Sequence, residues 1–207
     1  MSIFNQEFRP FAPHDFGGFF NSVGIHTANK YDVMICPTTR MSKVWAGLNY
    51  NQDTIQKYFN LTLVNLTIPN GAIATTAVRS YGEAVEMPYS KSYDSANFTH
   101  YLDNNGIVHE LYTAWMNEVF DPYTRTMGYY TDYACKIEIK MYRRMRGDNG
   151  FYNEPFVVVT LEDAYPKAIN PFSMQGLSGN APTQFDVTMT CRRILTKYNT
   201  KPIRNAN

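Results

Sequence analysis

A segment of strict alternation in the second half of the chain limits the possible folds more than any other feature. From residue 133 to 146, apolar side chains occupy most odd positions and charged side chains most even positions. Because side chains alternate between the two faces of a β-strand, this period of two predicts a strand with one dry and one charged face. The dry row is Ile137, Ile139 and Met141, and the row facing water is Lys136, Glu138 and Lys140.

The predicted strand is long, and a turn and a second apolar run follow it. At about 3.3 Å per residue, a strand over most of this segment would span roughly 40 Å, about twice the usual length. Residues 147–150 read Gly-Asp-Asn-Gly, and 155–161 are mostly apolar. These segments predict a long β-hairpin that overhangs its own domain, so its free edge needs another chain or a cover. The pattern favours assembly over catalysis.

Charge and composition narrow the class of partner. The 207 residues include 19 Lys and Arg against 18 Asp and Glu, a formal net charge of +1. This balance argues against tight non-specific binding of nucleic acid, which requires several cations to replace condensed counterions. Aromatic residues make up 15% of the chain, which suits sheets and surfaces buried against partners. No apolar run approaches the length of a membrane span and the N-terminus does not resemble a signal peptide, so no membrane partner is expected.

The sequence shows no pattern of catalytic or metal-binding residues. Its four histidines lack the spacing of metal ligands, and no nucleophile elbow, phosphate loop or dinucleotide fingerprint occurs. Cys36, Cys135 and Cys191 lie far apart in strand-like runs and are expected to be buried free thiols. We therefore expect no enzyme activity, no cofactor and no metal.

Three parts are predicted along the chain: an extended arm over 1–29, a β domain over 30–196 and a fraying tail over 197–207. The arm is rich in Phe, Pro and Gly, so it either orders by docking on a partner or packs loosely on its own domain. Phe8, Phe11 and Phe19 are its candidate contacts to a partner or to a neighbouring ring of subunits.

The domain begins with a short strand at 31–36, and a polar excursion over 37–57 is predicted to be a long loop. Arg40 and Trp45 in this excursion are further candidate contacts, although a Trp is more often packed on its own sheet. Other strands are predicted at 59–68, where a slip in alternation indicates a β-bulge, and at 72–78, 83–87, 98–102 and 185–195. Residues 162–169 are predicted to form a loop and 176–182 a turn.

One amphipathic helix is predicted over 105–120. Ile107, Leu111, Trp115 and Val119 recur every four residues, as on the buried stripe of a helix. Asp103 or Asn104 is expected to cap its start, and Pro122 to end it. The predicted core residues are Leu111, Trp115, Ile137 and Ile139. These elements predict a mainly β fold, an antiparallel β-sandwich or open barrel with one flanking α-helix and a long protruding β-hairpin.

Two segments together resemble the tail tube proteins of contractile bacteriophages. Segment 115–125, with Trp115 and the pair Asp121-Pro122, precedes the long strand. Segment 161–169, with Tyr165-Pro166, precedes a strand that reads Phe-Asp-Val-Thr from Phe185. The resemblance covers about 58–195 and extends equally to the baseplate proteins that initiate such tubes, so both roles stay open.

The resemblance implies a subunit that forms stacked, six-fold rings around a channel for DNA, with tail sheath and baseplate proteins as partners. It places the protein in the virion tail, assembled in the host cytoplasm. Strands of neighbouring subunits would join into a continuous barrel, and the residues we assign to that joining hairpin are Lys136, Glu138, Lys140, Arg144, Phe156 and Val158. A virion adhesion or receptor-binding β module is a further alternative, and a β-rich enzyme the least favoured one.

Overall fold

All strand pairs in the computed structural model are antiparallel, over a described chain of residues 31–79, 81–142, 155–172 and 182–199. One seven-stranded sheet has the order β1-β6-β7-β8-β5-β2 with β9 on β7, and β3 and β4 form a separate pair. The elements in chain order are β1 (Tyr31–Cys36), α2 (Thr39–Gly47), α3 (Gln52–Thr62), β2 (Leu63–Thr67), β3 (Gly71–Val78), β4 (Val85–Tyr93), β5 (Ala96–Tyr101), α4 (Ile107–Val119), α5 (Tyr130–Tyr133), β6 (Cys135–Tyr142), β7 (Pro155–Ile169), β8 (Gln184–Thr190) and β9 (Arg193–Tyr198).

Strand β7 belongs to two layers. Its first half pairs with β6 on one side and β9 on the other, and its second half pairs with β8. Asp163, at the change of partners, has a left-handed backbone with φ of 53°. The large sheet therefore folds over on itself, and in the described residues it does not close into a barrel. The predicted class, a mainly β open sandwich with antiparallel sheets, is confirmed.

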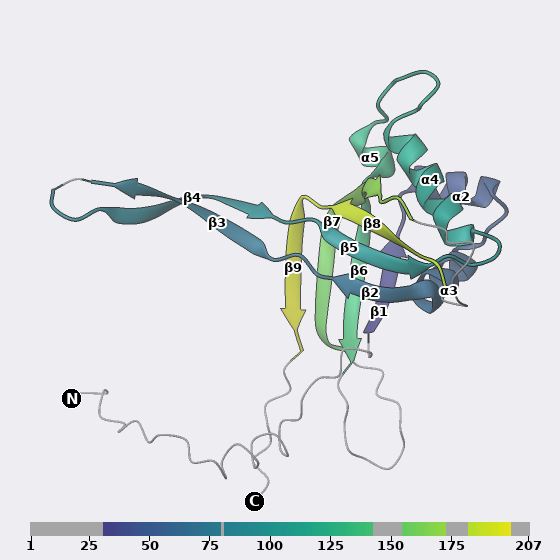
Figure 1. The fold of residues 1–207 in the computed structure, drawn as a ribbon, viewed down its shortest axis with the longest axis horizontal. Helices are drawn as coiled ribbons and strands as arrows, with labels where there is room; N and C mark the ends of the chain where they lie inside the picture. Colours follow the sequence, from purple (N-terminus) through teal and green to yellow (C-terminus); the bar gives the residue numbers. More distant parts are fainter. Residues whose placement is uncertain (1–30, 80, 143–154, 173–181, 200–207) are drawn as a thin grey trace, which may run out of the picture.

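The predicted hairpin is present as the paired strands β6 and β7, but its described residues are flanked by β1 and β9 and do not protrude from the sheet. Strand β6 is eight residues long and lies between β1 and β7 within the sheet, while residues 143–154 fall outside the described part of the chain. Tyr133, the first residue of the predicted strand, ends the short helix α5. Instead, β3 and β4 extend away from the body, on the side opposite the helices (Figure 1).

The predicted loop over 37–57 contains two helices, so a single flanking helix was an incomplete prediction. Helix α2 starts at Thr38, whose Oγ1 accepts a hydrogen bond from the Met41 N–H at 3.2 Å. In α3, Ile55 and Phe59 are four residues apart and both are buried. The predicted strand over 59–68 is wrong in its first half because Phe59 follows this helical period, and β2 comprises only Leu63–Thr67.

Two boundaries near the C-terminus also differ from the predictions. Residues 162–169 are the second half of β7 rather than a loop. The predicted strand over 185–195 is two strands, β8 and β9, separated where Arg192 N–H bonds to the Glu162 carbonyl at 3.1 Å. Strand β9 reaches Tyr198, past the start of the predicted tail.

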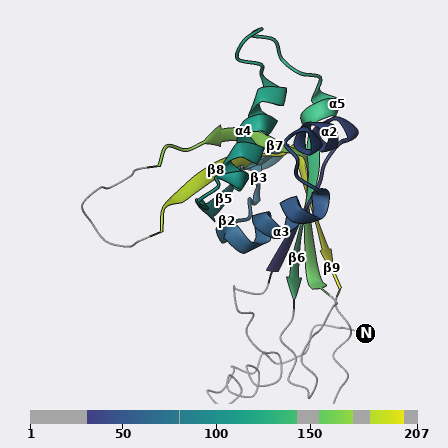
Figure 2. The same ribbon diagram turned by 90° about the vertical axis from the view of Figure 1, so that its right-hand side faces the viewer.

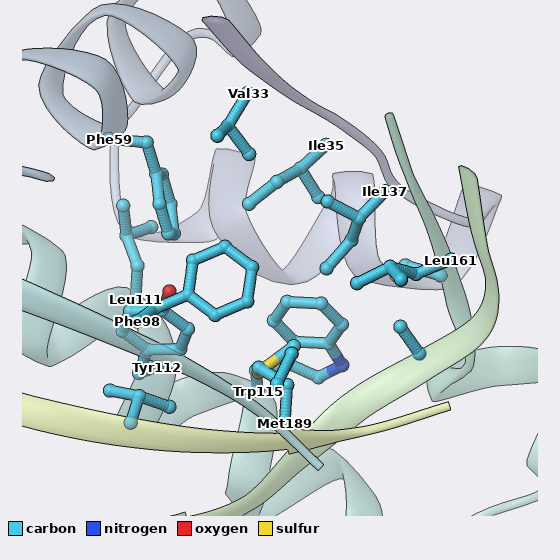
Figure 3. Close-up of a cluster of buried hydrophobic side chains, with 14 of the residues drawn as sticks. Val33, Ile35, Phe59, Phe98, Leu111, Tyr112, Trp115, Ile137, Leu161 and Met189 are labelled. Carbon is cyan, nitrogen blue, oxygen red and sulfur yellow. The ribbon is translucent and has the colours of Figure 1, made fainter. Parts of the chain in front are cut away.

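Helix α4 places the predicted core residues where the sequence puts them. Leu111 and Trp115 are buried in one cluster with Ile137 of β6 (Figure 3), and Ile139 of the same strand is also buried. The Trp115 Nε1–H donates to the Tyr133 carbonyl at 2.7 Å, which links α4 to α5. The start of the helix differs: Gly106, with φ of 63°, is the N-cap and no side chain caps the first turn. A residue without Cβ adopts this backbone freely, so neither Asp103 nor Asn104 is needed.

Helix α3 lies along the outer edge of β1 and hydrogen-bonds to its backbone. Gln56 Oε1 accepts from the Ile35 N–H at 3.1 Å, and Asn60 Oδ1 accepts from the Val33 N–H at 2.9 Å. The amide groups of Gln52, Gln56 and Asn60 donate to the carbonyls of the same two strand residues. These three side chains are four residues apart and share one helix face. This amide ladder occupies the place of a neighbouring strand.

Helices α2, α3 and α4 gather on one side of the strands, as a second view shows (Figure 2). Trp45 of α2 meets Trp115 of α4 edge to face, with ring centroids 5.6 Å apart. In the described part of the chain, no helix is long and apolar enough to cross a membrane.

Candidate functional site

The charged row of β6 lies on the face of the sheet opposite the core. Lys136 is exposed, and Glu138 and Lys140 are half-buried, while Ile137 and Ile139 between them are buried. The predicted alternation of faces is therefore confirmed. The register places Met34 of β1 opposite Glu138 and Val158 of β7 opposite Lys140.

Ion pairs within the row offset its charges. Lys136 Nζ lies 2.5 Å from Glu138 Oε1, and Lys140 Nζ lies 3.8 Å from Glu138 Oε2. The hydrogen bond from Lys136 holds the pKa of the Glu138 carboxyl below its usual value. The carboxylate is thus ionised near neutral pH, and three charged residues leave a net of one positive charge. Such a row presents polar groups without a strong field.

The other residues assigned to an inter-subunit hairpin are only partly placed by the structure. Phe156 and Val158 lie on β7 and are half-buried. Arg144 lies outside the described residues. The role of all six residues in joining subunits stays a prediction.

The candidate partner contacts in the N-terminal part of the chain differ in where the structure places them. Arg40 is exposed and pairs with Glu118 of α4, Nε to Oε2 at 3.1 Å. Trp45 has no exposed surface, so its assignment as a partner contact is wrong. The indole packs against Trp115 because α2, unforeseen in the sequence, turns it inward. Phe8, Phe11 and Phe19 lie outside the described residues.

An exposed surface with many apolar side chains lies on the β3–β4 hairpin, for which the sequence predicted no assembly role. Seven of eight residues in β3 and eight of nine in β4 are exposed. The large apolar residues exposed on this hairpin and its turn are Ile73, Val78, Tyr81, Val85, Met87 and Tyr89. The sequence of 71–78 gave a signal, because it lacks the alternation expected of a strand with one buried face, whereas 85–93 alternates although almost all of it is exposed.

A second exposed apolar surface lies on the connection between α4 and α5. Phe120, Tyr123, Met127 and Tyr129 are all exposed there. Asp121 orders the connection, because its Oδ1 accepts from the Tyr123 N–H at 2.8 Å and its Oδ2 accepts from the Thr124 hydroxyl at 2.8 Å. The Tyr123 N–H bond is the main cause that lowers the pKa of Asp121.

His100 is a titratable group with a strongly shifted pKa, and it is enclosed in the core. Thr62 Oγ1 donates its proton to the Tyr58 carbonyl at 2.8 Å, so it can only accept from His100 Nδ1 at 3.0 Å. His100 Nε2 must then accept from the Tyr112 hydroxyl at 3.1 Å. Phe59, Tyr112 and two further aromatic rings surround the imidazole. Burial lowers the pKa of His100 to about 3 and raises that of Tyr112.

His100 therefore joins β5, α3 and α4 as a neutral structural group without exposed surface. An open pocket of about 600 Å³ near Cys36 and Tyr50 has no carboxylate or histidine in its lining. Burial raises the pKa of the Cys135 thiol to about 11, and Cys36 and Cys191 are half-buried rather than buried as expected. Within the described ranges, no three His, Cys, Asp or Glu side chains gather as a possible metal site.

A model of the family described as "Phage tail tube protein" matches residues 26–197. A search of curated proteins finds no match. The matched range includes every described element from β1 to β8 and most of β9.

Solved structures with a similar fold come from contractile injection systems. The chain is 12% identical, at a TM-score of 0.54, to a chain of the PVC sheath–tube complex in the extended state, covering 91% of this chain and 99% of that one. A chain of the PVC sheath/tube terminator is 12% identical at a TM-score of 0.53, and the match covers 84% of this chain and 96% of that one. A chain of the anti-feeding prophage tube-terminating cap is 14% identical at a TM-score of 0.52, and the match covers 96% of this chain and 99% of that one. These likenesses show a shared fold. The family match spans well over half of the sequence, and the chain belongs to the phage tail tube protein family.

Proposed function

We propose that the chain is the repeating subunit of the tail tube of a contractile-tailed phage or a related particle. It forms six-fold rings that stack around a DNA-conducting channel, with sheath and baseplate proteins as partners. The subunit is structural and catalyses no reaction. It is assembled in the host cytoplasm and resides in the virion tail.

The observation that carries this proposal is the β3–β4 hairpin. A two-stranded hairpin with no third strand or helix against it is marginally stable in water. Yet this one extends away from the body with almost every residue exposed (Figure 1). Contact with another subunit would bury its apolar side chains and supply the missing stabilisation. Among the described elements, the hairpin takes the inter-subunit role that the sequence assigns to 133–161.

The near-neutral row of charges on the face of the sheet opposite the core supports the proposal of a DNA-conducting channel. Lys136 and Lys140 flank Glu138, so the row is polar and close to neutral. Tight phosphate binding requires several unpaired cations, and DNA would pass over such a lining without being held. The ordered connection between α4 and α5, with Tyr123 and Met127 exposed, is a surface for the sheath or a neighbouring ring.

Electron microscopy of the purified full-length chain tests this function. A repeating subunit must be complementary to itself along the tube axis, so long tubes are expected. Single rings that do not grow would instead assign the chain to the baseplate, as the initiator of the tube. A well-folded monomer at high concentration would reject both roles and favour an adhesion module.

A further inference from the structure

Asparagine followed directly by glycine is the pair of residues at which a peptide chain loses a side-chain amide most readily. The backbone nitrogen of the second residue attacks the amide carbon of the asparagine, and a glycine has no Cβ to hinder the approach. The sequence contains this pair at Asn70, Asn105 and Asn149. Asn149 lies outside the described residues, so the structure compares the first two.

The backbone around Asn105 opposes the reaction. The Gly106 N–H donates a hydrogen bond to the Asp103 carbonyl at 2.9 Å, and the Gly106 carbonyl accepts from the Glu110 N–H at 2.9 Å. Gly106 is also the N-cap of α4, so the helix fixes its position. The Asn105 side chain is exposed, but the neighbouring nitrogen must first break a hydrogen bond before it can attack.

The backbone nitrogen next to Asn70 has no such bond. Gly71, the first residue of β3, is paired in register with Tyr93 of β4. One step further out, the Asp94 N–H donates to the Asn70 carbonyl at 3.4 Å. Bonded and non-bonded residue pairs alternate along antiparallel strands, so Gly71 and Tyr93 form a non-bonded pair. The Gly71 N–H therefore points away from β4, and it has no acceptor in the described part of the chain.

The surroundings of Asn70 also permit the motion that the reaction requires. Asn70 and Gly71 are both exposed, and Asn70 lies just outside β3. The β3–β4 hairpin is a separate two-stranded sheet that extends away from the body (Figure 1). Such a pair opens locally at small free-energy cost, above all at its ends. Opening lets the Asn70 side chain rotate until its amide carbon reaches the Gly71 nitrogen.

We propose that Asn70 is a site of spontaneous deamidation, and that the product loosens the base of the β3–β4 hairpin. The Gly71 nitrogen bonds to Asn70 Cγ, the bond from Cγ to Nδ2 breaks, and the Gly71 proton leaves with the amide nitrogen as ammonia. The intermediate is a five-membered succinimide ring. Water then opens the ring at either carbonyl, which yields aspartate or isoaspartate.

Both products weaken the base of the hairpin. Each places a carboxylate at residue 70, opposite Asp94, and like charges opposite one another destabilise antiparallel strands. Isoaspartate in addition lengthens the main chain by one carbon, which displaces Gly71 from its register with Tyr93. The chemistry does not depend on the proposed tube function. A loss of assembly in the modified chain does rest on that function, because the hairpin is the surface proposed to contact another subunit.

Peptide mapping by mass spectrometry tests the site, on dissociated subunits of the full chain held in mildly alkaline buffer. Asn70 should deamidate roughly five- to tenfold faster than Asn105, because the hydrogen bond of the Gly106 N–H must break first. Gly71→Ala should slow the reaction at Asn70 to about the rate at Asn105. Its added Cβ would lie 2.8 Å from Lys91 Cε, the end of a flexible side chain that can move aside. Deamidation of Asn70 no faster than that of Asn105, or undiminished in Gly71→Ala, would overturn the assignment.

A matched pair of variants tests the consequence. Asn70→Asp carries the charge of the product from the start, and Asn105→Asp adds the same charge at an exposed position outside the hairpin. Hydrogen exchange of residues 71–78 should be roughly two- to fivefold faster in Asn70→Asp than in the native chain and unchanged in Asn105→Asp. Equal exchange in Asn70→Asp and the native chain would overturn the claim that the product loosens the hairpin. A native chain that forms no tubes would reject the proposed function and leave both of these results standing.

Discussion

At the scale of single residues, His100 decides how stability responds to acid. Its pKa is about 3 in the fold, against an ordinary value of 6.5. The unfolded chain therefore takes up a proton below pH 6.5 that the folded chain does not accept until about pH 3. The free energy of unfolding must fall as the pH falls through this window, by about 1.4 kcal/mol per pH unit, or about 2 kcal/mol between pH 7 and 5.

Urea unfolding at pH 7 and pH 5 measures this dependence. The carboxyl groups with lowered pKa, Asp121 and Glu138, affect stability mainly below their ordinary values of 3.8 and 4.5, so they contribute little above pH 5. His100→Gln should be less stable than the native chain and nearly independent of pH in this window. His109→Gln, at a half-buried position of α4 that packs against Phe172 and Phe185, is the control and should keep the native dependence. An equal dependence in His100→Gln would contradict the account.

The two tryptophans make a second prediction at this scale. Trp115→Ala should cost about 3–5 kcal/mol of unfolding free energy, as for large buried side chains. Substituting Phe for each Trp keeps an aromatic ring in the core but removes the indole N–H. This change therefore separates the contribution of packing from that of hydrogen bonding. Trp115 Nε1–H donates to Tyr133, whereas Trp45 Nε1–H has no hydrogen-bond partner among the described residues. Trp115→Phe should therefore lower the free energy of unfolding by about 1 kcal/mol more than Trp45→Phe. Equal midpoints of chemical denaturation for Trp115→Phe and Trp45→Phe would contradict this predicted difference.

At the scale of elements, α3 serves as a substitute for a strand. Asn60→Ala should release the Val33 amide to exchange, and Gln56→Ala should release that of Ile35, because each loses its only described acceptor. Each change should also cost about 1 kcal/mol per hydrogen bond lost. Residue-resolved exchange by NMR measures both. Lys57→Ala, exposed on the same helix, should leave the two amides protected. Continued protection of Val33 in Asn60→Ala would show that the ladder is not what covers the edge.

The same elements show what the sequence could and could not predict. The alternation in β6 and the four-residue period in α4 were readable, because one face of each is buried and the other is not. The helices at 39–62 were missed because their buried residues, Met41, Trp45, Ile55 and Phe59, form short helical periods among polar side chains. Phe59, Leu61 and Leu63 also fit a strand, and only tertiary contact with β1 selects the helix.

At the scale of the whole molecule, the sequence predicted a long hairpin over 133–161, and its two strands are the paired β6 and β7, while its tip at 143–154 lies outside the described residues. Alternation over 135–142 marks a strand with a core on one side, and this strand, β6, lies within the sheet. Of the two segments that extend away, 71–78 lacks alternation, whereas 85–93 alternates even though both of its faces meet solvent in the single chain. The candidate assembly residues on the charged face were predictable from their spacing.

Electron cryomicroscopy of tubes assembled from the purified chain tests the central claim most directly. We predict stacked six-fold rings in which the face carrying Lys136, Glu138 and Lys140 lines the channel and the β3–β4 hairpin contacts a neighbouring subunit. A tube with that charged face turned outward, or a hairpin still surrounded by solvent, would contradict the proposed orientation. A protein that remains monomeric under all assembly conditions would contradict the claim that it builds a tube.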